Sequence, residues 1–368
     1  MQRIAYLCLS EGWGGLEMNQ LRNAEQMRQR GHEVLVIAHK ESPITHAAQQ
    51  LNIPVHFVVQ KPKHYQWLFA YRLSRFLQKE DYSTLFFRNN RELSIAASVR
   101  FFSFGKVGVH YFMEMALGGN KTQFFRTLRY LWINSWVCPL PYLVAQVKQQ
   151  TKIAEHKIKH IHSGISLEKK VELSQLDARK QLGLPLEQKI WLVVGRIDPK
   201  KQQGFIWNCF KERNSDKELL VFVGDPTPDE NANYQTTLRQ QIDEHPKKYQ
   251  VRWVGFQQNM IPYYRAADLV LMAANLETVG MVTLEALQNN CPVVGAGNGG
   301  TKELIDTYGG GACFTSLNVA SLNSTVNKVL NKDYPTLNRD LFEQHFDFNN
   351  VCAQVETEVL GLHAPIFL

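Results

Sequence analysis

Loops that contain glycine follow short apolar runs at four places in the chain, and each leads into a helical pattern. They lie at residues 10–17, 193–201, 275–287 and 295–304. Glycine lets a backbone approach a ligand closely, and the start of a helix offers N–H groups and a positive dipole end to an anion. The first segment is not a G-x-G-x-x-G fingerprint, and the second is not a P-loop. These segments indicate phosphate binding, and for the first and the fourth alone a tight turn without a ligand is the alternative.

Two cations follow the second of these runs. Arg196 comes directly after Gly195, and Lys201 follows across the turn at Pro199. Both side chains can reach one point above the end of the preceding strand, where two fixed positive charges suit a diphosphate. A pair of ordinary surface cations is the other interpretation.

Two carboxylates belong to the third segment. Glu277 falls in a loop, the next helix begins near Gly280, and Glu285 lies inside that helix. The N–H groups of Gly280, Met281 and Val282 are therefore available to hold phosphate. A buried carboxylate needs fixed partners, and ribose hydroxyls would suit Glu285, although a hydrogen bond to backbone within the fold is the simpler role.

Short β-branched runs alternate with amphipathic ones along the chain, which is typical of βαβ units with a parallel sheet covered on both faces. The runs form two successive series. The predicted strands of the first are residues 4–9, 34–38, 55–59, 84–87, 107–111 and 136–138, and those of the second are 190–194, 220–223, 251–254, 269–272 and 292–294. We therefore predict an α/β protein with two Rossmann-like, doubly wound domains, whose ligands bind at the carboxyl ends of the strands.

The predicted domains are residues 1–165 and 166–349, with a C-terminal helix at about 350–368 that packs back on the first. Residues 1–168 hold 21 Lys and Arg against 11 Asp and Glu, net +10, whereas residues 169–368 hold 20 against 23, net −3. A basic first half suggests an anionic partner, and we expect an anionic membrane surface rather than nucleic acid. Six cysteines without a C-x-x-C spacing predict buried thiols and no metal site.

The N-terminal run is too short for a signal peptide, and no apolar run reaches the ~18 residues of a membrane span. We therefore expect a cytoplasmic protein. Peripheral contact with the inner face of the membrane is suggested by the helical segment 124–132, and we predict that Lys121, Arg126 and Arg129 lie on one helix that faces lipid. An amphipathic helix that packs on the sheet is an equally good interpretation of that segment.

The ordered set of segments resembles family 4 of the retaining glycosyltransferases, which have the GT-B fold of two Rossmann-like domains facing each other across a cleft. The resemblance runs from Arg3 to at least Ile305. The residues that carry it are Gly14-Gly15-x-Glu17, Arg30-Gly31-His32-Glu33-Val34, Gly195-Arg196 with Lys201, Val223-Gly224-Asp225, Val254-Gly255, Tyr264-Arg265-Ala266-Ala267-Asp268, Glu277 seven residues before Glu285, and Pro292-Val293-Val294.

The resemblance implies transfer of a sugar from a nucleoside diphosphate sugar to a glycan or lipid-linked acceptor, with retention at the anomeric carbon and without a metal ion or cofactor. Arg196 and Lys201 would stabilise the leaving diphosphate, Glu277 would hold sugar hydroxyls, and Glu285 would hold the ribose. Gly14, Gly15, Gly195, Val254, Gly280, Met281 and Val282 would contact the donor. The first domain would bind the acceptor, and the pathway would be bacterial polysaccharide or lipopolysaccharide synthesis.

The sequence departs from the family where a histidine is often found near the reactive end of the sugar. His110 lies inside a strand run, and Glu114 lies closer to the expected loop, so that role stays open between them. A nucleotide-sugar 2-epimerase of the same fold and a non-catalytic partner subunit are the alternative functions.

Overall fold

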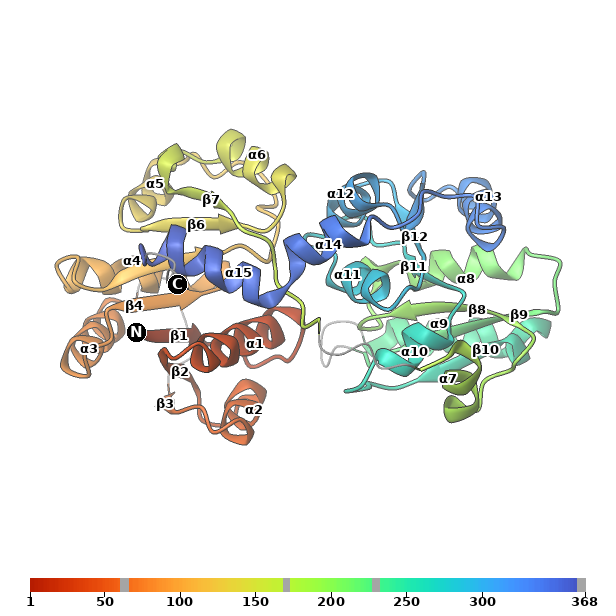
Figure 1. Ribbon diagram of the computed structural model, residues 1–368, viewed down its shortest axis with the longest axis horizontal. Helices are drawn as coiled ribbons and strands as arrows, with labels where there is room; N and C mark the ends of the chain where they lie inside the picture. Colours follow the sequence, from red (N-terminus) through yellow and green to blue (C-terminus); the bar gives the residue numbers. More distant parts are fainter. Residues whose placement is uncertain (60–65, 168–172, 227–231, 363–368) are drawn as a thin grey trace. The chain divides into compact units, whose positions relative to one another are not determined.

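The computed structural model describes residues 1–59, 66–167, 173–226 and 232–362 of the chain. The chain divides into two compact units. The N-terminal unit is Met1–Ser166 with Gln344–Leu368, and the C-terminal unit is Leu167–Glu343. Each unit contains one parallel sheet flanked by helices (Figure 1).

The N-terminal unit contains a seven-stranded sheet in the order β3-β2-β1-β4-β5-β6-β7. Its strands are β1 (Arg3–Cys8), β2 (Glu33–His39), β3 (Val55–Val58), β4 (Thr84–Phe87), β5 (Gly108–Phe112), β6 (Ser135–Cys138) and β7 (Ile158–His160). Its helices are α1 (Gly15–Gln29), α2 (Pro43–Gln50), α3 (Trp67–Lys79), α4 (Leu93–Phe102), α5 (Phe124–Leu131) and α6 (Pro141–Gln150). The strands at the centre are buried on both faces, which explains their nearly continuous apolar sequences.

The C-terminal unit repeats the arrangement with six parallel strands in the order β10-β9-β8-β11-β12-β13. They are β8 (Lys189–Val194), β9 (Glu218–Val223), β10 (Val251–Val254), β11 (Leu269–Met272), β12 (Val293–Ala296) and β13 (Gly311–Phe314). The helices are α7 (Gln175–Leu182), α8 (Gln203–Lys211), α9 (Ala232–Asp243), α10 (Ile261–Ala266), α11 (Met281–Gln288), α12 (Gly299–Tyr308) and α13 (Val319–Leu330). The chain passes from this unit to the N-terminal one within α14 (Arg339–Phe346). The predicted fold class, two doubly wound parallel sheets, is confirmed.

Two strands, β7 and β13, were not predicted from the sequence. Each is the last strand at one edge of its sheet. The residues of β7 are half-buried or exposed, and β13 contains two half-buried positions. An edge strand lacks a neighbouring strand on one side and is less buried than a central strand. Neither segment therefore needs the apolar run by which the other strands were predicted.

The end of the chain returns to the N-terminal unit. Helix α15 (Phe348–Gln354) continues into a π-helical turn at Val355–Val359 and packs against α1. Arg30 donates to Glu356 through Nε at 3.0 Å, and the buried His32 ring lies 2.9 Å from the same carboxylate. These bonds fasten the C-terminal segment to the end of α1, and the Arg30 hydrogen bond, with His32 adding to it, lowers the pKa of Glu356 against the effect of burial.

Candidate functional site

The loop after β8 has a fixed backbone and an exposed arginine. Gly195 donates through N to Val223 at 3.0 Å, and the Arg196 carbonyl accepts from the Gln203 side chain at 2.8 Å. Asp198 is buried and caps the short turn at Pro199–Lys201 by accepting from Lys200 N at 2.8 Å. The Arg196 side chain is exposed. The loop therefore presents a solvent-exposed positive charge on a hydrogen-bonded backbone at the carboxyl end of β8.

Lys201 and Glu277 form an ion pair, with 2.7 Å between Nζ and Oε2. The pair joins the loop after β8 to the loop after β11, because these strands are neighbours in the sheet. The side chains are 29% and 20% exposed. The sequence alone predicts roles for Lys201 and Glu277 separately. The structure brings them into contact at the end of the sheet where ligands of such sheets bind.

The helix α11 begins directly after the Glu277 loop. Gly280 precedes it with φ of 79°, a left-handed conformation that strongly favours glycine. Met281 and Val282 are the first two residues of the helix and are half-buried. Their N–H groups belong to the first turn and have no acceptor within the helix. The predicted start of this helix is confirmed, and its positive dipole end follows Glu277 by four residues along the chain.

The fourth glycine segment supports Glu277 rather than forming a separate turn. Gly300 donates through N to the Glu277 carbonyl at 2.7 Å. A Cβ atom built on Gly299 would lie 2.5 Å from that same carbonyl oxygen, so the helix α12 can approach the loop only with glycine at this position. The segment therefore fixes the backbone that carries the Glu277 side chain.

Glu285 is half-buried, whereas the sequence-based interpretation assumed a buried carboxylate. It lies inside α11 as predicted, where its Oε2 accepts from the Tyr264 hydroxyl at 2.8 Å. The partial exposure reduces the cost of desolvating the carboxylate, since water still reaches it. Tyr264 orients this carboxylate, a role that no sequence pattern indicated because the two residues belong to different helices.

The predicted donor contacts outside these loops lie at two strand ends. Gly14 and Gly15 follow β1, and α1 begins at Gly15 with Gly14 as its extended N-cap. A Cβ on Gly15 would meet no atom of the described chain within 4 Å, which leaves open space at the start of the helix. Val254 ends β10 and accepts through its carbonyl from Gly224 N at 3.0 Å.

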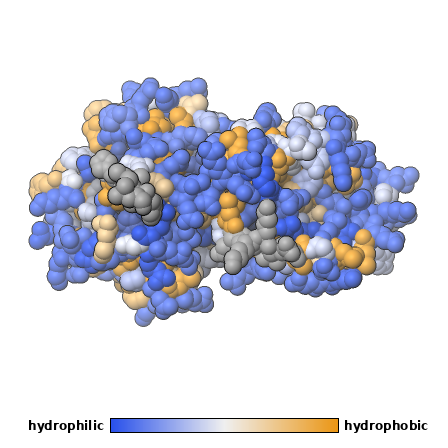
Figure 2. Space-filling view, in the orientation of Figure 1, coloured by the Kyte–Doolittle hydropathy of each residue, from blue (hydrophilic) through white to orange (hydrophobic). Residues whose placement is uncertain are grey.

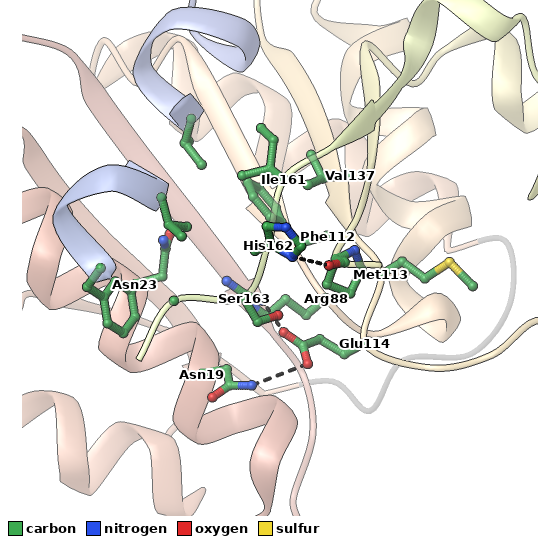
Figure 3. A pocket seen from close by; sticks show the side chains of 15 residues that line it. Asn19, Asn23, Arg88, Phe112, Met113, Glu114, Val137, Ile161, His162 and Ser163 are labelled. Atoms are coloured by element: carbon green, nitrogen blue, oxygen red, sulfur yellow. Dashed lines mark hydrogen bonds and ion pairs between the residues drawn. The ribbon is translucent and has the colours of Figure 1, made fainter. Parts of the chain in front are cut away.

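A pocket lies in the N-terminal unit at the carboxyl ends of β5 and β6, and Glu114 is one of its walls. Figure 3 shows the Glu114 carboxylate reached from two sides, by Arg88 and by Asn19. Arg88 pairs with Oε1, and Asn19 Nδ2 donates to Oε2 at 3.3 Å. The side chains of Arg88 and Glu114 are 9% and 5% exposed. Burial raises the pKa of Glu114, and the adjacent Arg88 charge counteracts part of that rise.

His110 is a core residue of β5. Its Nδ1 lies 2.8 Å from Ser135 Oγ, and its ring packs edge-on against Phe86. Burial, with the charge of Arg100 adding to it, lowers the pKa of His110 to about 3. Of the two residues between which the sequence left the role open, Glu114 lines the pocket and His110 packs within the sheet.

Within the described ranges, no helix is both long and apolar enough to cross a membrane. The same residues contain no group of three His, Cys, Asp or Glu side chains arranged to hold a metal ion. That the activity needs no metal ion stays a prediction.

Two family models match the chain, one on each unit. Residues 13–169 match the model described as Glycosyltransferase Family 4, and residues 174–344 match that of Glycosyl transferases group 1. The D-inositol 3-phosphate glycosyltransferase of Mycolicibacterium smegmatis is 28% identical over 211 residues, which are 55% of this chain and 48% of that protein. The chain spans about half or less of the length of such curated relatives.

Solved structures share the fold over nearly the whole chain. The Anabaena protein Alr3699/HepE, in complex with UDP and glucose, has a TM-score of 0.83 at 20% identity, covering 98% of this chain and 100% of that one. The lipopolysaccharide outer core galactosyltransferase WaaB has a TM-score of 0.71 at 15% identity, covering 98% and 99%. With one family model on each unit and this shared fold, the chain belongs to glycosyltransferase family 4 and has the GT-B fold.

Proposed function

We propose that the protein is a retaining glycosyltransferase that moves a sugar from a nucleoside diphosphate sugar to a glycan or lipid-linked acceptor, without a metal ion. In this reaction the acceptor oxygen forms a bond to the anomeric carbon while the bond to the diphosphate oxygen breaks. The acceptor attacks from the face that the diphosphate leaves, and its proton passes to the departing diphosphate. No covalent glycosyl-enzyme is required.

The observation that carries the proposal is the Lys201–Glu277 ion pair. The loop that carries Lys201 also carries the exposed Arg196, and the loop that carries Glu277 leads into the start of α11. The departing diphosphate gains negative charge as the bond breaks. Fixed cations and helix N–H groups that meet this charge lower the barrier in the way a metal ion does in other enzymes. Glu277, once its lysine partner turns to phosphate, would accept hydrogen bonds from sugar hydroxyls, and Glu285 would hold the ribose.

The donor class is supported by the relatives. UDP and glucose are named as bound in the Anabaena structure, and the Mycolicibacterium relative and WaaB are glycosyltransferases by name. We extend this to a nucleoside diphosphate sugar for the present chain. The name of WaaB, a lipopolysaccharide outer core galactosyltransferase, supports a role in the synthesis of bacterial lipopolysaccharide or another cell-surface polysaccharide. We propose that the protein works on the cytoplasmic side of the membrane.

We assign the acceptor to the pocket of the N-terminal unit. Glu114 and Asn19 present polar atoms there, and Phe112 and Phe348 supply apolar walls. The enclosed space is only about 20 Å³, little more than one water molecule needs. We therefore infer that one hydroxyl group of a sugar or another polyol enters the pocket and bonds the carboxylate or amide there, while the rest of the acceptor stays outside.

The test is incubation of the full chain with a panel of nucleotide sugars and candidate glycan acceptors, while nucleoside diphosphate release and sugar products are monitored. We expect release that depends on acceptor with at least one donor, and a product with the donor's anomeric configuration. Conversion of the donor sugar without an acceptor would favour a 2-epimerase. Donor binding without turnover over the whole panel would favour a non-catalytic partner subunit.

A further inference from the structure

Large apolar side chains gather on the outer faces of α3, α4 and α5. Of the 19 exposed large hydrophobic side chains in the described chain, nine belong to these helices or to residues just after them. We call this set the aromatic face: Trp67, Leu68, Tyr71, Phe101, Phe104, Phe124, Leu128, Leu131 and Trp132. Trp67 is 60% exposed and Phe124 is 71% exposed. Figure 2 shows apolar patches over α5 and at the end of α4.

The spacing on α5 shows that this exposure belongs to one helix face. Phe124, Leu128 and Leu131 follow one another at intervals of four and three residues, which aligns them along one side of a helix. All three are exposed. An amphipathic helix normally turns such a stripe towards the core, so the sequence carries an apolar stripe that the fold of this unit does not use.

The aromatic face continues from α3 to α5 through contacts between rings. Tyr71 of α3 packs against Phe102 with 5.7 Å between ring centroids, Phe102 packs against Phe101 at 5.3 Å, and Phe101 packs against Trp132 at 5.0 Å. Such edge-to-face contacts hold large side chains in place at the surface. The face is therefore a connected patch rather than a set of scattered residues.

The same helices are purely basic. Between them α3, α4 and α5 contain six Arg and Lys residues and no Asp or Glu: Arg72, Arg75, Lys79, Arg100, Arg126 and Arg129. Arg72, Arg75 and Lys79 are exposed. They follow Trp67, Leu68 and Tyr71 along the outer side of α3, so apolar and basic side chains share one surface.

The predicted set of lipid-facing cations is corrected by the geometry. Lys121 precedes α5 and is not part of it. Arg129 turns towards α4, where its Nη1 donates to Ser94 Oγ at 2.7 Å. That bond fixes α5 on the unit, and Lys157 Nζ completes the attachment by donating to the carbonyls of Tyr130 and Leu131 at 3.3 and 2.9 Å. The exposed cations are supplied mainly by α3.

An anionic bilayer satisfies both features of the aromatic face. Trp, Phe and Leu side chains enter the boundary between headgroups and acyl chains, while Arg and Lys pair with anionic headgroups. A second copy of this chain would instead bring the exposed cations of one α3, Arg72, Arg75 and Lys79, opposite those of the other, which is unfavourable at contact distance. Charge complementarity thus selects a negatively charged partner, and the connected apolar patch selects one with a hydrocarbon interior.

We propose that the aromatic face of α3, α4 and α5 docks the N-terminal unit on the surface of an anionic membrane. Docking would hold the unit at the plane where a lipid-linked acceptor is found, and in this respect the inference extends the proposed function. The surface itself is independent of catalysis, because no residue of the aromatic face belongs to the Lys201–Glu277 site or lines the pocket at Glu114.

The test is co-sedimentation of the full chain with vesicles of phosphatidylcholine alone or mixed with phosphatidylglycerol, without donor or acceptor. We expect binding to the anionic vesicles that weakens as salt is raised, since mobile ions screen exposed charges. Replacing Arg72 and Arg75 by serine should weaken binding about thirtyfold, because each basic residue near an anionic surface contributes roughly a factor of five. The triple variant Phe124→Ser, Leu128→Ser and Leu131→Ser should reduce binding to both vesicle types.

The matched control is Leu176→Ser with Leu317→Ser, two exposed leucines of the C-terminal unit. This variant should bind vesicles like the unchanged chain, and all variants should keep their melting temperature and nucleoside diphosphate binding. Equal binding to neutral and anionic vesicles would overturn the proposal, as would binding that survives both sets of α3 and α5 substitutions. A lipid-free dimer that the same substitutions dissociate would show that the face covers a second copy instead. Loss of donor turnover with intact vesicle binding would contradict only the proposed function.

Discussion

Both units place a cation and a carboxylate after neighbouring strands, but the two pairs have different surroundings. Arg88 and Glu114 follow β4 and β5 of the N-terminal sheet, and only 9% and 5% of their side chains are exposed. Lys201 and Glu277 follow β8 and β11 of the C-terminal sheet, with 29% and 20% exposed. The Arg88–Glu114 pair is therefore strongly desolvated, whereas the Lys201–Glu277 pair remains partly in contact with water.

This difference separates two functions that an ion pair can have. Separating a buried pair leaves each charge desolvated without a partner, which costs much free energy. A buried pair therefore keeps its neighbours in place and rearranges with difficulty. A partly exposed pair contributes little to stability and can open at small cost. The Lys201–Glu277 pair can exchange its internal contact for phosphate and sugar, whereas Arg88 and Asn19 hold the Glu114 carboxylate in one orientation.

The largest expected effect is on stability, at the buried pair. Arg88→Met should lower the free energy of unfolding of the N-terminal unit by about 3–5 kcal/mol, because it leaves the Glu114 charge buried without its partner. Thermal and urea unfolding measure this loss. The double variant Arg88→Met with Glu114→Leu should recover much of it, since both charges are then absent. If the single variant lost less than about 1 kcal/mol of unfolding free energy, the Arg88–Glu114 pair would contribute no more to stability than an exposed ion pair does.

The opposite result is expected at the partly exposed pair. Lys201→Ala should change the unfolding free energy by no more than about 1 kcal/mol. It should nevertheless lower kcat about a hundredfold, the scale found when one electrostatic stabiliser of a transition state is removed. Arg196→Ala should act in the same direction. Lys200→Ala, at the exposed neighbouring position, is the control and should retain activity; full activity of Lys201→Ala would contradict the assignment of this site.

The fold could be predicted because its signals are local. The apolar runs of the central strands and the glycine before α11 depend only on neighbouring residues, and Gly280 and Glu285 were therefore placed correctly on their loop and helix. The edge strand β7 has no such signal, because its residues are half-buried or exposed.

The contacts between distant residues could not be predicted. Lys201 and Glu277 are 76 positions apart, and their pairing depends on which strands become neighbours and how the two loops bend. The pairing of Arg88 with Glu114 depends in the same way on β4 and β5. Arg129 could be recognised as a cation on a helix, but its turn towards Ser94 depends on how α5 packs against α4.

A moderate effect should separate the two carboxylates of the C-terminal unit. Glu285→Ala should weaken binding of the nucleoside diphosphate about tenfold or more, as expected when a charged hydrogen-bond partner is lost. Glu277→Ala should leave that binding nearly unchanged and lower turnover of the full donor, since its partners are on the sugar. Isothermal titration with the nucleoside diphosphate, beside steady-state kinetics, distinguishes the two.

Tyr264→Phe is the matched control for this pair of variants. It removes the hydroxyl that donates to Glu285 while keeping the ring, so it should weaken nucleoside diphosphate binding in the same direction as Glu285→Ala but by less. Equal nucleotide affinity of the Glu285→Ala variant and the unchanged chain would remove the proposed distinction between these carboxylates.

The smallest expected effect concerns pH and arises from His162 at the pocket of the N-terminal unit. Burial, followed by the charges of His160 and His345, lowers the pKa of His162 to about 3, and its Nδ1 donates to the Pro139 carbonyl at 2.9 Å. The ordinary value is about 6.5, so below that pH the unfolded chain binds a proton that the folded chain does not. This group therefore reduces stability progressively as pH falls from about 6.5. Between pH 7.5 and 5.5 the loss should be about 1 kcal/mol.

His162→Gln isolates this contribution, because glutamine keeps a side-chain N–H but cannot be protonated in this range. The variant should be less stable than the unchanged chain at pH 7.5, where the histidine fits its site, and the difference should shrink by pH 5.5. The substitution His46→Gln at an exposed position of α2 should leave the pH dependence as it is. Urea unfolding at several pH values supplies the measurement. The difference in unfolding free energy between His162→Gln and the unchanged chain could instead stay constant with pH. That result would mean that the His162 ring binds a proton as readily in the folded chain as in the unfolded one. The strong desolvation at Arg88 and Glu114 would then not extend to the His162 side of the pocket.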